Sequence, residues 1–194
     1  MTTMPACAVL GLGNVLMGDD GFGPFATRTF TSVFAPHADV AVIDAGTPGL
    51  DLAPYLMDRD AVIVIDTIRL DAPPGTMRIY RKPALLQAPP AQRLGPHDPG
   101  LAATLMLLEL QGSAPREVVL VGVVPATVAT FLGLSETIEA TVPAVIDAVA
   151  AELARLGRPV MRRAVPAAPD LWWLRRQPDA ALSHSTVPAP TAGR

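Results

Sequence analysis

Short runs of apolar residues recur along the first two thirds of the chain, and each is bounded by glycine, proline or a carboxylate. Such runs are typical of strands that are buried on both faces of a parallel sheet. The clearest example holds four β-branched residues in succession, within 61–66. We predict buried strands at 7–13, 39–44, 61–66 and 117–123. Alternating residues over 76–80 predict a further strand at the edge of the sheet.

Helical segments alternate with these strands. We predict helices over about 21–34, 49–57, 99–110 and 135–156, with Ser135 at the N-cap of the last one. The resulting order, β-α-β-α-β-β-α-β-α, is typical of an open α/β sheet. The prediction is therefore an α/β fold, a single domain with a twisted, mostly parallel open sheet flanked by helices on both faces.

The chain changes character after Gly157. Residues 158–194 are rich in proline, arginine and alanine and end in a stretch of Ser, Thr, Pro and Ala, a composition that favours irregular structure. We predict a domain over 1–157 and a largely irregular tail over 158–194. The pair Trp172-Trp173 is the exception that could dock on the domain, although the sequence does not show where.

Composition narrows the class of protein. The chain has 194 residues, of which 50% are hydrophobic, and a formal net charge of −3. This balance argues against a nucleic-acid or anionic-membrane binder, which needs clustered Lys and Arg. No apolar stretch reaches the roughly 18–20 residues that span a bilayer, and the start of the chain lacks the positive region of a signal peptide. We expect a cytoplasmic protein with neither a nucleic-acid nor a membrane partner.

Cysteine and histidine are scarce. The single cysteine, Cys7, excludes an internal disulfide framework and a cysteine-based zinc site. Because Cys7 begins an apolar run, we expect it in the core. His37 lies in a polar turn and His184 in the tail, so we expect both to face solvent.

Polar side chains that could carry chemistry follow the predicted strands. In doubly wound sheets the site lies outside the carboxyl ends of the strands. Asp19 and Asp20 follow the first strand, and Asp66 ends the third. A long Pro-rich connection over 82–96 then delivers His97 to the start of a helix. Acidic and imidazole groups from separate parts of the chain therefore converge on one edge of the sheet.

Structural roles are open for each of these residues. One of Asp19 and Asp20 could cap the following helix, and Asp66 could bond to the backbone of its own turn. His97 could be an exposed loop residue. Asp44 could be a ligand, but its Asp-x-Gly-Thr setting more often fixes a turn through Asx bonding. Two adjacent carboxylates exceed what capping needs, so we expect at least one of them to be functional.

The first loop matches the nucleotide-binding fingerprint only in part. Gly11 and Gly13 fit the first two glycines of G-x-G-x-x-G, but Leu16 stands at the third position. Asp19 and Asp20 would repel a pyrophosphate. A nucleotide-binding enzyme is therefore disfavoured. The chain also lacks the G-x-S-x-G motif of serine hydrolases and the H-E-x-x-H motif of zincins.

The converging side chains favour two kinds of chemistry. Two carboxylates and one imidazole, with open positions, suit a divalent ion such as nickel, zinc or iron. The same groups could also perform acid–base hydrolysis without a metal. The residues alone leave both routes open.

Several spaced motifs follow one another in a fixed order: Leu-Gly-Leu-Gly-Asn and Asp-Asp-Gly within 10–21, Asp-Ala-Gly-Thr at 44–47, Ile-Asp at 65–66, Pro-His at 96–97 and Leu-Val-Gly-Val-Val-Pro at 120–125. In this order they resemble the hydrogenase maturation protease family, the endopeptidases that trim the C-terminus of the [NiFe]-hydrogenase large-subunit precursor. The resemblance covers residues from about 8 to 156 and none of the tail.

The resemblance implies a metal-binding cleft made of two acidic residues and one histidine. By position these are Asp20, Asp66 and His97, and they are also the catalytic residues that the family implies. Relatives often carry Glu at the first position. Asp20 is one methylene shorter, which could shift the position of the metal or its affinity.

The resemblance also implies a function: a hydrolase, similar to aspartic-type endopeptidases, that removes the C-terminal extension of the precursor after nickel insertion. The nickel is borne by the substrate and recognised by the enzyme, so that only a loaded precursor is cut; another divalent metal could replace it in vitro. The alternative is a non-catalytic maturation chaperone that binds nickel or the precursor. An acid–base role for Asp19 or Asp66 is a competing mechanism.

Overall fold

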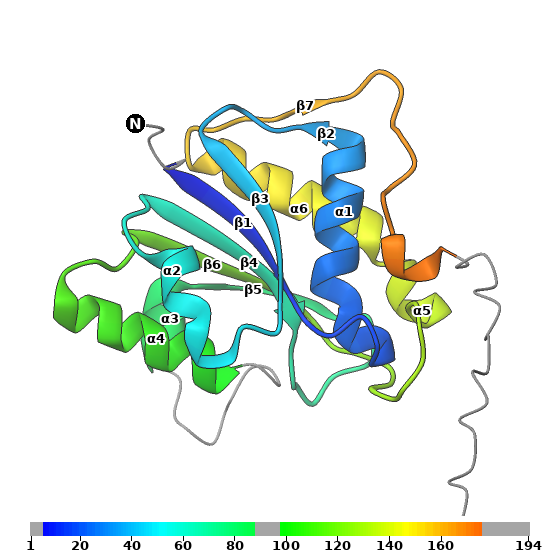
Figure 1. Cartoon of the computed structure of the whole chain (residues 1–194), viewed down its shortest axis with the longest axis horizontal. Coiled ribbons are helices and arrows are strands. Elements are labelled where there is room, and N and C mark those ends of the chain that lie inside the picture. Colours follow the sequence, from blue (N-terminus) through cyan, green and yellow to red (C-terminus); the bar gives the residue numbers. More distant parts are fainter. Residues whose placement is uncertain (1–5, 88–97, 176–194) are drawn as a thin grey trace, which may run out of the picture.

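The computed structural model describes residues 6–87 and 98–175 (Figure 1). Within these residues the centre of the molecule is a five-stranded sheet in the order β3-β1-β4-β6-β5. The first four strands in this order run parallel, and β5, at one edge, pairs antiparallel with β6. The predicted α/β fold is therefore confirmed, including its edge strand. The strands are β1 Cys7–Leu12, β3 Val40–Gly46, β4 Ala61–Thr67, β5 Met77–Arg81 and β6 Glu117–Val123.

Helices cover both faces of this sheet (Figure 1). One face packs against α1 Phe22–Val33 and α6 Val142–Arg155, and the other against α2 Ala53–Leu56, α3 Lys82–Gln87 and α4 Asp98–Gln111. The short elements are the 3-10 helices η1 Gly18–Gly21, η2 Gly49–Leu52 and η3 Trp172–Leu174, the helix α5 Glu136–Glu139, and the strands β2 Phe34–Ala35 and β7 Met161–Arg162. No helix within the described residues is both long and apolar enough to span a bilayer.

Alternate residues of each central strand point to opposite faces, so every such strand contributes to two cores. In β1, Cys7 and Val9 join the cluster under α1 and α6, whereas Ala8 and Leu10 join the cluster under α2, α3 and α4. A strand that is buried on both faces has no solvent-facing positions for polar residues. This explains why the runs that predict the central strands are apolar without interruption.

Two predicted segments differ from the structure. The predicted single helix over 135–156 is two helices, α5 and α6. Pro143 lies in the first turn of α6, and because proline lacks an N–H and clashes with the preceding turn, it suits a helix start and not a helix interior. The predicted connection over 82–96 begins with α3, whose Leu85 is buried in the core.

The segment after α6 packs on the domain although it holds little regular structure. β7 pairs with β2 in antiparallel register, with Phe34 opposite Arg162. Trp173 is only 7% exposed and joins the core cluster under α1 and α6, while its neighbour Trp172 is 56% exposed. The tryptophan pair therefore docks on the domain through Trp173. The division of the chain at residue 157 stays a prediction.

Candidate active site

The candidate site lies where the chain reverses its path through the sheet. β1 leads to β3 on one side, and the chain then crosses back to β4 on the other side of β1. The loops after β1 and β4 part at this point, where open α/β sheets bind their ligands. η1 follows β1 and lies against β4. Asp20 of η1 and Asp66 of β4 therefore lie at the same edge of the sheet, and each is 5% exposed.

Close packing of α1 on the sheet determines where η1 lies. A Cβ atom on Gly23, near the start of α1, would lie 2.2 Å from the carbonyl oxygen of Leu12 and 2.5 Å from that of Ile65. Only a residue without a side chain permits this approach. Gly11 of β1 lies equally close to Gly23, since a Cβ atom on Gly11 would lie 2.4 Å from the Gly23 carbonyl oxygen. Gly11 thus has a structural role in which no nucleotide is involved.

The carboxylate of Asp20 closes the loop between β1 and η1. The backbone nitrogen of Asn14 donates a hydrogen bond of 3.0 Å to Oδ2 of Asp20. A Cβ atom on Gly13, whose φ is 136°, would lie 1.8 Å from the Asp20 carbonyl oxygen, so the loop passes directly over this residue. Gly21 occupies the N-cap of α1, and no side-chain hydrogen bond caps that helix. Neither Asp19 nor Asp20 therefore occupies the N-cap position of α1.

Asp19 binds the loop that follows β6. Its carboxylate is fully buried, and Oδ2 accepts hydrogen bonds of 2.9 Å from the backbone nitrogens of Ala126 and Thr127. The backbone nitrogen of Ser135 donates one of 2.7 Å to Oδ1, and the Ser135 hydroxyl donates another of 3.0 Å to Oδ2. These bonds satisfy the carboxylate within the protein. Asp19 therefore has a structural role, and the acid–base role considered for it stays untested.

Ser135 occupies the predicted N-cap position, but of the short helix α5, and its side chain does not cap that helix. The hydroxyl is committed instead to the Asp19 carboxylate, far away in the sequence. A local capping pattern cannot reveal such a partner, because the bond depends on how η1 and the loop after β6 meet.

Asp66 is the penultimate residue of β4, and its carboxylate is nearly buried. Its Oδ1 accepts a hydrogen bond of 2.7 Å from the backbone nitrogen of Thr67, a local bond of the kind that we considered for a turn residue. A carboxylate offers about four lone-pair positions. The local bond and a role in the site are therefore compatible.

Asp44 fixes the turn after β3, as its motif favours. The backbone nitrogen of Gly46 donates a hydrogen bond of 3.3 Å to Oδ1 of Asp44, and the guanidinium of Arg28 lies 3.5 Å from Oδ2. The backbone nitrogen of Gly13 in turn donates a bond of 2.8 Å to the carbonyl oxygen of Gly46. This turn therefore supports the loop that carries Asp20.

His97 and His184 lie outside the described residues, so the third predicted ligand stays a prediction. The helix that follows His97 in the sequence, α4, packs its first turn against the segment after β3, because a Cβ atom on Gly100 would lie 2.8 Å from the Gly49 carbonyl oxygen. Among the described residues, no group of three or more His, Cys, Asp or Glu side chains could hold a metal ion.

Cys7 and His37 lie as predicted and take no part in the candidate site. Cys7 is fully buried in β1, and burial raises the pKa of its thiol to about 11. His37 is exposed and hydrogen-bonds Asp39, an interaction that lowers the pKa of that carboxyl. Both residues lie near the amino ends of the parallel strands, away from Asp20 and Asp66.

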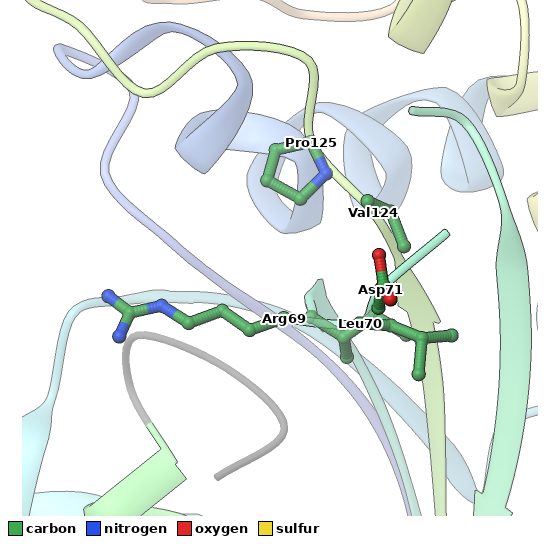
Figure 2. Close-up of a pocket in the computed structure, with 6 residues that line it drawn as sticks. Arg69, Leu70, Asp71, Val124 and Pro125 are labelled. Carbon is green, nitrogen blue, oxygen red and sulfur yellow. The ribbon is translucent and has the colours of Figure 1, made fainter. Parts of the chain in front are cut away.

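A cavity of about 440 Å³ opens after the carboxyl ends of β4 and β6. Figure 2 shows the side chains around it. No local sequence pattern indicates this cavity, although one wall follows Asp66 closely along the chain. It is lined by Ile68, Arg69, Leu70, Asp71, Val124 and Pro125.

The arrangement of Asp20 and Asp66 supports two kinds of chemistry. Two carboxylates at one edge of the sheet supply oxygen ligands for a divalent ion. One carboxylate at the same place also serves as a general base toward water. The crossing of the chain from β3 to β4 brings Asp20 and Asp66 to that edge.

Comparisons with known proteins agree with the resemblance in the sequence. A family model described as hydrogenase maturation protease matches residues 26–152. An Escherichia coli K12 protein named hydrogenase 2 maturation protease is 34% identical over 154 residues, which cover 77% of this chain and 91% of that protein. Hydrogenase expression/formation protein HupD of Bradyrhizobium diazoefficiens is 32% identical over 161 residues, which cover 82% of this chain and 84% of that protein.

Solved structures share the fold. The hydrogenase maturating endopeptidase HybD from E. coli has a TM-score of 0.73 and 32% sequence identity, covering 81% of this chain and 97% of that one. The [NiFe] hydrogenase maturation protease HybD from Thermococcus kodakarensis has a TM-score of 0.61 and 26% identity, covering 76% of this chain and 98% of that one.

Proposed function

The chain belongs to the hydrogenase maturation protease family, and from that premise we propose that it removes the C-terminal extension of a [NiFe]-hydrogenase large-subunit precursor after nickel insertion. The observation that supports this proposal is the position of Asp20 and Asp66 at one edge of the sheet, at the point where the chain changes direction. Both are nearly buried carboxylates on elements that pack against each other.

In this proposal the nickel belongs to the substrate. Asp20, Asp66 and His97 are the metal-binding and catalytic residues. Three ligands from this chain leave coordination positions open, so they would complete the coordination of an ion that the precursor already holds. Cleavage would then depend on nickel loading, and the protease would act as a checkpoint. Another divalent metal could take the place of nickel in vitro.

Peptide hydrolysis requires water to add to the scissile carbonyl carbon, the C–N bond to break and a proton to reach the leaving amine. A metal ion polarises the carbonyl or activates the water when it is bound. In the competing mechanism no ion is needed, and a carboxylate accepts the proton of the attacking water. With Asp19 committed to the loop after β6, Asp66 is the carboxylate that would take this role in place of metal binding.

The proposal is tested by the mass of a purified large-subunit precursor before and after incubation with the protein, with and without nickel. We expect a C-terminal segment to be lost only from the loaded precursor. Equal cleavage of the nickel-free precursor would refute nickel recognition. An unchanged mass together with a stable complex would instead support the alternative of a non-catalytic maturation chaperone.

A further inference from the structure

The cavity after β4 and β6 has rigid walls. One wall begins at Ile68, whose backbone nitrogen donates a hydrogen bond of 2.9 Å to the Val123 carbonyl oxygen. The other begins at Val124, whose nitrogen donates one of 3.0 Å to the Thr76 carbonyl oxygen, and whose carbonyl accepts one of 2.8 Å from Gly75. Backbone bonds therefore hold both walls in place, so the cavity exists before any ligand arrives.

A glycine keeps the floor of the cavity in place. A Cβ atom on Gly122 of β6 would lie 2.3 Å from Cγ2 of Ile68. The absence of a side chain at position 122 lets Ile68 turn across the end of β6. Ile68 is fully buried there and Val124 is 7% exposed, so the two side chains form a closed apolar floor.

Both walls continue into the candidate site. Ile68 stands two residues after Asp66 on the same segment. Pro125, on the opposite wall, is followed by Ala126, whose nitrogen donates a hydrogen bond to the buried carboxylate of Asp19. Asp19 neighbours Asp20. One wall of the cavity therefore follows Asp66 along the chain, and the other leads into the loop that binds Asp19, the neighbour of Asp20.

The chemistry of the lining favours an apolar occupant. The floor carries no hydrogen-bonding side chain, and Leu70 and Pro125 add apolar surface at the sides. A polar group buried against this floor would lose its hydrogen bonds to water without replacement. The two charged side chains of the lining, Arg69 and Asp71, are both exposed, and Figure 2 shows Arg69 extending away from Leu70 and Val124. A volume of about 440 Å³ lies within the range of pockets that bind small ligands, so it holds a large side chain.

We infer that this cavity is the subsite that holds an apolar side chain of the precursor next to the scissile peptide bond. The inference rests on the proposed function, because it assigns a subsite to that cleavage. The occupant is a residue of the substrate peptide. It lies next to the cleaved bond because one wall follows Asp66 along the chain and the other leads into the loop that binds Asp19.

The test measures which side chains the enzyme accepts on each side of the cleaved bond. Mass spectrometry of the released peptide first maps the bond. Precursors that carry Ala, Leu or Phe at each flanking position are then cleaved by four variants of the protein. Val124→Phe fills the cavity and Leu70→Ala enlarges it. The matched controls, Val165→Phe and Leu110→Ala, change side chains that are 83% and 88% exposed elsewhere.

At one flanking position, we expect Val124→Phe to lower kcat/KM for Leu relative to Ala by about 10-fold, since each methylene in an apolar pocket contributes about that factor. Leu70→Ala should shift the preference toward Phe, and both controls should keep the wild-type preference. If Val124→Phe fails to fold, as judged by circular dichroism, the half-exposed Leu70 variant still decides the matter.

Two negative results are distinguishable. A wild-type protein that cleaves the precursor, with folded pocket variants that keep its preferences at both positions, overturns the subsite and leaves the proposed function intact. A wild-type protein that cleaves no loaded precursor overturns the proposed function, and the subsite with it.

Discussion

The backbone nitrogen and the hydroxyl of Ser135 both donate hydrogen bonds to the buried carboxylate of Asp19, at 2.7 and 3.0 Å. This pair joins the first loop of the chain to the loop after β6. Together with the bonds from Ala126 and Thr127, it fixes one wall of the candidate site to the element that carries Asp20. A carboxylate next to the proposed ligand thus acts as an internal support.

Removal of this support should destabilise the fold. Asp19→Ala leaves backbone N–H groups of the loop without their acceptor, and we expect the free energy of unfolding to fall by about 2 to 4 kcal/mol. Ser135→Ala removes only the hydroxyl bond and should cost about 1 kcal/mol. Urea unfolding measures both values. An Asp19→Ala protein as stable as the wild type would contradict the structural role.

Changes to the proposed site should act on cleavage and spare the fold. Asp20→Asn and Asp66→Asn keep the side-chain shape but remove the charge, and His97→Ala removes the imidazole. We expect each to lower kcat/KM for a loaded precursor by about 100-fold or more, with the circular dichroism spectrum unchanged. Asp58→Asn is the matched control, because Asp58 is exposed near the amino end of β4. Wild-type rates in the Asp66 variant would remove that residue from the mechanism.

The contact of Gly23 with the sheet should tolerate no side chain. A methyl group there would lie 2.2 and 2.5 Å from two carbonyl oxygens, so Gly23→Ala must move α1 away from β1 and β4. We expect a loss of about 3 kcal/mol or more in the free energy of unfolding, at the upper end for overpacked sites. Gly112→Ala is a control for glycine replacement itself, because nothing lies within 4 Å of its Cβ position although its φ is 70°. It should cost about 1 to 2 kcal/mol.

The two neighbouring tryptophans should differ sharply. Trp173→Ala empties a buried site in the core cluster under α1 and α6 and should cost about 3 to 5 kcal/mol. Trp172→Ala changes a side chain that is 56% exposed and should cost less than about 1 kcal/mol. Thermal unfolding of the two single variants makes the comparison. If both variants lose the same free energy of unfolding, the docking of the segment after α6 does not depend on Trp173.

The buried thiol of Cys7 predicts a loss of stability at alkaline pH. Its pKa is raised from 9.0 to about 11, so between these values the unfolded chain binds fewer protons than the folded one. The free energy of unfolding should therefore fall as the pH rises through this window, by up to about 2 to 3 kcal/mol from this group. Cys7→Ala lacks this contribution, and the difference between its unfolding curves and those of the wild type isolates the thiol. If the free energy of unfolding of both proteins changes with pH in the same way, the thiol makes no such contribution.

Particular elements show how far sequence patterns predict this fold. The strands β4 and β6 could be predicted closely because burial on both faces leaves a continuous apolar run. The break between α5 and α6 could not be predicted. Pro143 has no N–H and loses no hydrogen bond in the first turn of a helix, where N–H groups have no carbonyl partner within the helix. A helical pattern of apolar residues does not show where that first turn lies. Trp173 was a candidate for docking, but its partners lie in elements far away in the sequence.

The order of strands and helices, the apolar cores and the family of this protein followed from the sequence alone, because burial leaves a local pattern and motifs keep their spacing. The tertiary structure alone separated the roles of two adjacent carboxylates. Asp19 and Asp20 are chemically identical in the sequence, yet the loop after β6 supplies four hydrogen bonds to Asp19 and none of these to Asp20, which lies on an element that contacts the strand of Asp66. That difference depends on contacts between segments more than 100 residues apart, which no local pattern records.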